Sequence, residues 1–197
     1  MSTTTMKEST LKLTQLSILT ALIAVLAFTP LGFIMIPPIS MTTLHIPVVI
    51  GAILLGPTCG GILGFFFGLM SMIRASGGAS PVDMLFSPFL SGEPISSIIM
   101  CFVPRILLGV ITGLLFLWLK KMNVNSYINI TISVLIGTLC HSLLVYSCLW
   151  VFFDYLPFKK IIILAFSLKA IPEKLVAILI TTAVCKPLMR LYAKKTA

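Results

Sequence analysis

Four ionisable side chains lie inside long apolar stretches of the sequence. They are Arg105 in FVPRILLG, His141 in LCHSLLVYSCLW, and Lys169 and Glu173 in SLKAIPEKL. If these stretches cross a membrane, a charged group in them is costly and by default faces the protein interior or a water-filled cavity at a functional site. A guanidinium is well suited to hold a carboxylate through two parallel hydrogen bonds. The chemistry predicted for these residues is binding of a polar, anionic ligand.

Each of these groups also has a purely structural interpretation. Arg105 can pair with Glu173 or extend its charge toward the membrane surface. Lys169 and Glu173 are four residues apart, so they share one helix face and can pair with each other. His141 is as readily explained by a buried, hydrogen-bonded histidine as by a ligand contact.

Three further residues are candidates for ligand contact near the ends of apolar stretches: His45 in TTLHIPV, Arg74 and Tyr146. His45 and Arg74 can orient a ligand or fix loops by bonding backbone carbonyls, and Tyr146 can equally anchor the chain at the membrane interface. His45 and His141 lack further ligands at suitable spacing, so we expect no metal site. We expect no cofactor, and the cysteines are interpreted as small buried hydrophobes.

Motifs typical of enzymes are missing from the sequence. We find no Walker A sequence, GxSxG, HExxH or aspartate cluster. The predicted protein is therefore not an enzyme, and it cannot hydrolyse ATP alone. Glu173 is the only carboxylate in an apolar stretch, so a self-sufficient carrier driven by protons or sodium would depend on it.

The composition indicates an integral membrane protein. Of the 197 residues, 58% are hydrophobic and only 10% are charged, against about a quarter charged in soluble domains. Apolar blocks of spanning length cover residues 13–36, 44–73, 94–119, 126–153 and 160–185. The second block contains Gly56-Pro57 and Gly60-Gly61, so it is either one kinked helix or a hairpin of two.

Basic residues favour the hairpin. The cytoplasmic ends of membrane helices are rich in Lys and Arg. Six crossings place eight such residues on one side of the membrane and three on the other. The eight are Lys7, Lys12, Lys120, Lys121, Lys186, Arg190, Lys194 and Lys195, and the three are Arg74, Lys159 and Lys160. Five crossings give no bias. We expect an all-α bundle of six transmembrane helices with both termini cytoplasmic, forming one domain over residues 1–197.

Two other features concern the surface of this bundle. The outer segments 29–44 and 74–94 contain prolines, glycines and aromatic residues, so they are expected to fold over the bundle as a lid. Ser17, Ala21 and Ala24 form a small-residue stripe on the first helix, where another helix can approach closely. This stripe predicts docking of a partner, with packing inside the same chain as the alternative.

With these features, the motifs TTLHIPVVIGAILLGPTCGG, FSPF and CFVPRILLGV resemble the substrate-binding S component of an energy-coupling factor (ECF) vitamin transporter. LGFI, TTLHIP, LLGP, FSPF and VPRIL are similar to the pantothenate-specific branch of that family. The resemblance implies a vitamin-binding subunit of the cell membrane that docks through its first helix onto a transmembrane coupling protein with two ATPases. The docking motif AxxxA of the family corresponds to Ser17 and Ala21, with serine in place of the first alanine.

If pantothenate is the ligand, Arg105 is the expected partner of its carboxylate, with Lys169 as the competing candidate. His141 and Glu173 are then expected to bond its hydroxyl or amide groups. A different vitamin of the riboflavin, folate, pyridine or pyrimidine type remains an alternative, as do the ion-coupled carrier and, more remotely, a membrane-embedded enzyme. No nucleic acid partner is expected.

Overall fold

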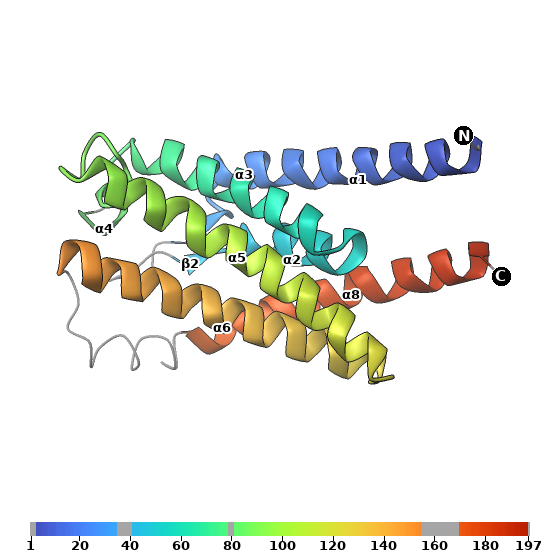
Figure 1. Ribbon diagram of the computed structural model, residues 1–197. Coiled ribbons are helices and arrows are strands. Elements are labelled where there is room, and N and C mark those ends of the chain that lie inside the picture. Colours follow the sequence, from blue (N-terminus) through green and yellow to red (C-terminus); the bar gives the residue numbers. More distant parts are fainter. Residues whose placement is uncertain (1–2, 35–40, 79–80, 155–169, 197) are drawn as a thin grey trace.

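The computed structural model is a bundle of antiparallel helices, and it describes residues 3–34, 41–78, 81–154 and 170–196. Both termini lie at the same end of the bundle (Figure 1). This confirms the predicted helical class, with a two-residue antiparallel strand pair added, β1 (Phe33–Ile34) and β2 (Met41–Thr42). The helices in the described ranges are α1 (Thr3–Ala27), α2 (His45–Leu55), α3 (Pro57–Ala75), α4 (Pro81–Met84), α5 (Pro94–Lys121), α6 (Ser126–Phe153) and α8 (Ala170–Thr196).

The second apolar block is a hairpin of two helices. Gly56 ends α2 and precedes α3 with φ 97°, a conformation that L side chains rarely adopt, and Pro57 follows at the first position of α3. The hairpin interpretation is therefore confirmed over the single kinked helix. In the described ranges, four helical segments are long and apolar enough to cross a membrane: residues 9–27 of α1, and α3, α5 and α6. At 11 residues, α2 is shorter than the about 20 that a full span needs.

Helices α3 and α5 approach each other along a seam of glycines. A Cβ built on Gly64 would lie 2.1 Å from the carbonyl oxygen of Arg105, and one on Gly68 would lie 2.6 Å from that of Cys101. Gly60 meets the backbone of Gly109 in the same way. The seam lies within the chain, and it sets the distance between α3 and Arg105.

The segment between α3 and α5 is held against the start of α5. The hydroxyl of Ser97 donates to the carbonyl of Leu85 at 2.7 Å, and the thiol of Cys101 donates to that of Phe86 at 3.1 Å. Both contacts fix the FSPF motif, which begins at Phe86. In the other outer segment, β1 pairs with β2, and the Thr43 hydroxyl donates to the Leu31 carbonyl at 2.8 Å.

Candidate ligand site in the bundle

Arg105 lies buried in α5 with its guanidinium between two aromatic rings. Its side chain is 5% exposed, and Cζ lies 5.5 Å from the ring centroid of Phe67 and 5.0 Å from that of Phe86. One terminal nitrogen donates to the carbonyl of Met100, while Nε has no acceptor among the described residues. A guanidinium carries five N–H donors, so Arg105 has donors to spare for a ligand.

Phe67 connects Arg105 to His141. The rings of Phe67 on α3 and His141 on α6 lie 5.9 Å apart between centroids. Nε2 of His141 is buried and has no hydrogen-bond partner in the described part of the chain. A buried polar atom without a partner costs free energy unless a ligand or water completes it.

His45 and Glu173 face each other in this region. Nδ1 of His45 lies 3.7 Å from Oε1 of Glu173, which joins the start of α2 to the start of α8. The His45 side chain is 4% exposed and that of Glu173 is 27% exposed. Nε2 of His45 has no partner among the described residues. Glu173 thus faces His45 and not Arg105, so the proposed Arg105–Glu173 salt bridge is not observed.

The structure brings these groups into one electrostatic neighbourhood. Arg105, His45 and Lys174 are all close enough to His141 to interact with it electrostatically. Glu173 interacts with Tyr146 in the same way. Helices α2, α5, α6 and α8 therefore each contribute a polar side chain, and cations outnumber the single carboxylate. Such an arrangement is suited to an anion that also carries hydrogen-bonding groups.

One predicted site residue, Arg74, lies away from this cluster. Nη1 of Arg74 donates to the carbonyl of Ala27 at 3.0 Å, so it satisfies a carbonyl at the end of α1. This corresponds to the structural interpretation of Arg74, in which it bonds a backbone carbonyl. Lys169, together with its predicted pairing to Glu173, lies outside the described residues.

Three residues near the candidate site were not predicted as ligand contacts from the sequence. Phe67 and Phe86 flank Arg105, and Lys174 is 8% exposed beside the polar groups. FSPF was noticed only as a motif, and Phe67 stands in the run FFF without any contrast to its neighbours. Within the described ranges, no group of three or more His, Cys, Asp or Glu side chains could hold a metal ion.

The small-residue stripe of α1 faces outward. Ser17 and Ala21 are exposed and Ala24 is half-buried. The Ser17 hydroxyl donates to the Leu13 carbonyl at 3.0 Å, so its polarity is satisfied within the helix. Only 11% of the apolar window of α1 is buried. The alternative, that Ser17 and Ala21 pack inside the same chain, does not fit their exposure.

These features define a helical, multi-pass membrane protein with a buried, mainly cationic cluster between its helices. Residues 11–189 match the family model for the substrate-specific component of ECF transporters, and the chain belongs to this family. It is accordingly a transporter component and not an enzyme.

Two relatives show which branch of the family this chain resembles. The pantothenic acid transporter PanT of Lactococcus lactis subsp. cremoris (strain MG1363) is 29% identical over 162 residues, which cover 78% of this chain and 80% of that protein. The pantothenate transporter PanT of Leuconostoc mesenteroides subsp. mesenteroides is 33% identical over 109 residues, 54% of this chain and 48% of that protein. The expected similarity to the pantothenate branch is therefore confirmed.

Proposed function

We propose that this chain is the pantothenate-binding subunit of an ATP-driven ECF import complex. The observation that carries the proposal is the buried Arg105, which has unused N–H donors. In the same region, Nε2 of His141 and Nε2 of His45 are buried without a hydrogen-bond partner among the described residues. The two relatives named as pantothenate transporters support the choice of ligand. Pantothenate has one carboxylate, two hydroxyls and an amide, which match a mainly cationic cluster that also holds hydrogen-bonding groups.

In the bound state the guanidinium of Arg105 holds the carboxylate. His141, His45 and Glu173 bond the hydroxyl and amide groups, with Tyr146 at the edge of the site. The rings of Phe67 and Phe86 exclude water around the charge pair, which strengthens it. The outer segments that contain the β1–β2 pair and Phe86 cover the ligand.

The proposal includes the membrane arrangement. The chain is one domain over residues 1–197 that crosses six times with both termini in the cytoplasm, as the basic residues favour. Ser17, Ala21 and Ala24 on the exposed face of α1 dock onto the coupling protein, whose two ATPase partners supply the energy. The vitamin enters from the outer side and leaves inward.

The test measures pantothenate binding to the purified chain by calorimetry. Arg105→Ala is expected to weaken binding by at least about 2 kcal/mol, because a buried charge pair is broken. Arg74→Ala is the matched control, since Arg74 bonds the end of α1, and it should leave affinity unchanged. Wild-type affinity in Arg105→Ala would exclude the direct role, and tighter binding of riboflavin, folate or another vitamin would exclude pantothenate as the ligand.

A second measurement addresses the ion-coupled carrier. Vesicles that contain only this chain should not accumulate pantothenate when a proton or sodium gradient is imposed. Accumulation that disappears in Glu173→Gln would establish the carrier instead, because Glu173 is the only acid in an apolar stretch.

A further inference from the structure

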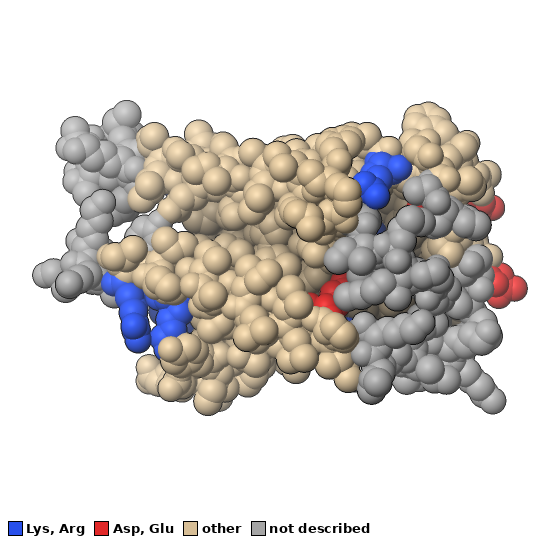
Figure 2. Space-filling model, turned by 180° about the vertical axis from the view of Figure 1, so that it is seen from behind, with Lys and Arg blue, Asp and Glu red and all other residues tan. Residues whose placement is uncertain are grey.

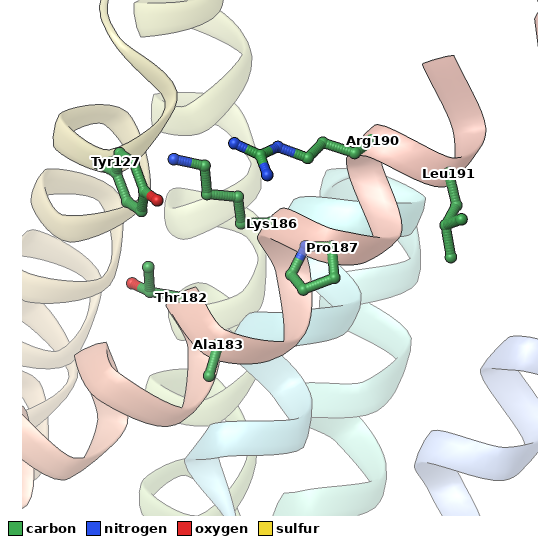
Figure 3. A pocket seen from close by; sticks show the side chains of 7 residues that line it. All are labelled: Tyr127, Thr182, Ala183, Lys186, Pro187, Arg190 and Leu191. Carbon is green, nitrogen blue, oxygen red and sulfur yellow. The ribbon is translucent and has the colours of Figure 1, made fainter. Parts of the chain in front are cut away.

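A second polar site lies toward the end of the bundle that carries the termini, between α6 and α8. It is a pocket of about 660 Å³, a size typical of small-ligand sites. Lys186 and Arg190 on α8 line it together with Tyr127, which is near the start of α6 (Figure 3). The proposed vitamin site uses none of these residues.

Three polar residues of α8 face this pocket from one side of the helix. Thr182, Lys186 and Arg190 are spaced four residues apart, so they form a single stripe. The Lys186 ammonium lies over the ring of Tyr127, and the side chains of Lys186 and Arg190 extend to the same side of α8 (Figure 3). Two like charges one turn apart repel each other unless an anion lies between them.

Within the part of the chain that the structure describes, no acidic side chain pairs with Lys186 or Arg190. The carboxylate of Glu173 lies beside His45, at the starts of α2 and α8. Figure 2 shows most of the described Lys and Arg surface of one face gathered at one end, with the Asp and Glu surface in the other half. The hydroxyl oxygen of Thr182 is buried and has no partner within the described ranges, so a third donor is available to a ligand.

The surroundings of the pocket are those of a membrane interface. Leu191 is 64% exposed and points away from Lys186 and Arg190, and Pro187 lies between Lys186 and Leu191 (Figure 3). At the same end of the bundle, Trp118, Lys120 and Lys121 line another pocket, on α5. Aromatic and basic residues of this kind gather where headgroups meet the hydrocarbon. A ligand here has its charge in the pocket and its apolar part along Leu191.

We propose that this pocket binds the phosphodiester headgroup of an anionic phospholipid. Lys186, Arg190 and the Thr182 hydroxyl donate to the phosphate oxygens, and the acyl chains run along the apolar flank at Pro187 and Leu191. The lipid joins α6 to α8 at the end of the bundle opposite the outer segments. Basic pockets between membrane helices have the chemistry that lipid headgroups require.

The experiment titrates the full chain in a nonionic detergent with phosphatidylglycerol and counts bound lipids by native mass spectrometry. Lys186→Gln with Arg190→Gln should weaken retention about 30-fold, since both cations next to the phosphate are lost. Lys120→Gln with Lys121→Gln removes the same charge at the same end and should leave retention unchanged. Lys186→Arg with Arg190→Lys should keep it, and Thr182→Val should weaken it without changing charge.

Other probes separate the sources of phosphate. Phosphatidylcholine, which has the same phosphodiester but no net charge, should bind more weakly, and inorganic phosphate should not displace the lipid. The proposal is overturned if the two double glutamine variants lose lipid equally, or if Lys186→Gln with Arg190→Gln and Thr182→Val both retain it. It is also overturned if phosphatidylcholine binds as tightly as phosphatidylglycerol, or if inorganic phosphate displaces the lipid. Pantothenate affinity should stay unchanged in all these variants, which separates this site from the vitamin site.

Discussion

Arg105 and His141 share one neighbour, the ring of Phe67. The negative face of an aromatic ring attracts a cation, and the attraction is stronger where water is excluded. The ring therefore helps to hold the guanidinium in the bundle before any ligand arrives. Phe67 is fully buried, so it also fixes the direction from which Arg105 meets a carboxylate.

Phe67→Leu is expected to weaken pantothenate binding by about 1 kcal/mol, roughly fivefold, because the cation–π contact is lost while the site stays apolar. Phe65→Leu is the matched control in the same run, since Phe65 is 45% exposed and stacks on Phe102. Calorimetry on both variants checks this. Equal losses would show that the effect comes from general packing of α3 and not from the ring beside Arg105.

The residues of the candidate site could be predicted in part from the sequence. Arg105, His141 and Glu173 stand out because a polar group in an apolar stretch needs a reason to be there. Phe67 could not be found in this way, since one phenylalanine among three has no contrast with its neighbours. Lys174 was not predicted as a site residue, because nothing in the sequence says which lysine near Pro172 turns inward.

At the scale of elements, the α3–α5 seam places Arg105. A Cβ at Gly64 would collide with the Arg105 carbonyl at 2.1 Å, and backbone cannot move aside without displacing the helix. At Gly61 the nearest atom is a methyl group of Val110 at 3.1 Å, which can shift by rotation. The two glycines are three residues apart on one helix, but only at Gly61 can the neighbouring side chain make room for a methyl group.

Gly64→Ala is expected to destabilise the protein by about 1 to 3 kcal/mol through overpacking and to reduce pantothenate affinity as Arg105 moves. Gly61→Ala should be nearly neutral, since alanine favours the helix by about 1 kcal/mol over glycine. Thermal unfolding in detergent, followed by binding assays, compares them. A Gly64→Ala protein as stable as Gly61→Ala would contradict a rigid seam.

The elements were predictable where the chain itself carries the signal. Gly56-Pro57 indicated the break between α2 and α3, because few other residue pairs combine positive φ with a helix start. The short α4 and the β1–β2 pair were not predicted, since both depend on contacts with other parts of the chain. The start of α1 at Thr3 was also missed, because its first turns are too polar to register as an apolar block.

At the scale of the whole molecule, α1 is the least buried of the spanning segments. Its outer face carries large apolar residues beside the small stripe, with Ile18 at 62% and Leu22 at 43% exposed. In a bilayer this face contacts lipid tails, which are as apolar as a partner helix, so docking there depends on close packing. Bulk on the stripe should therefore block docking without harming the fold.

Ser17→Trp with Ala21→Trp is expected to abolish assembly with the coupling protein and vitamin import, while pantothenate binding by the isolated chain persists. Leu22→Trp, on another part of the same exposed helix, is the control and should assemble normally. Copurification and uptake measured together check this prediction. Normal assembly of the double variant would exclude the stripe as the docking surface.

Composition alone was enough to predict the membrane class, because 10% charged residues cannot cover a water-exposed surface. The family was predictable from motifs spread over most of the chain. The arrangement of the polar cluster was not, since His45 and Glu173 are far apart in sequence and meet only after α2 and α8 pack together.

The segregation of bases toward the end with the termini has a consequence in a living membrane. With that end in the cytoplasm, the negative interior voltage holds the bundle in place, since each elementary charge moved across 100 mV costs about 2.3 kcal/mol. If the bundle reorients to release its ligand inward, part of its basic end moves through that voltage. Reorientation is then electrogenic, and its rate should rise when the membrane is depolarised.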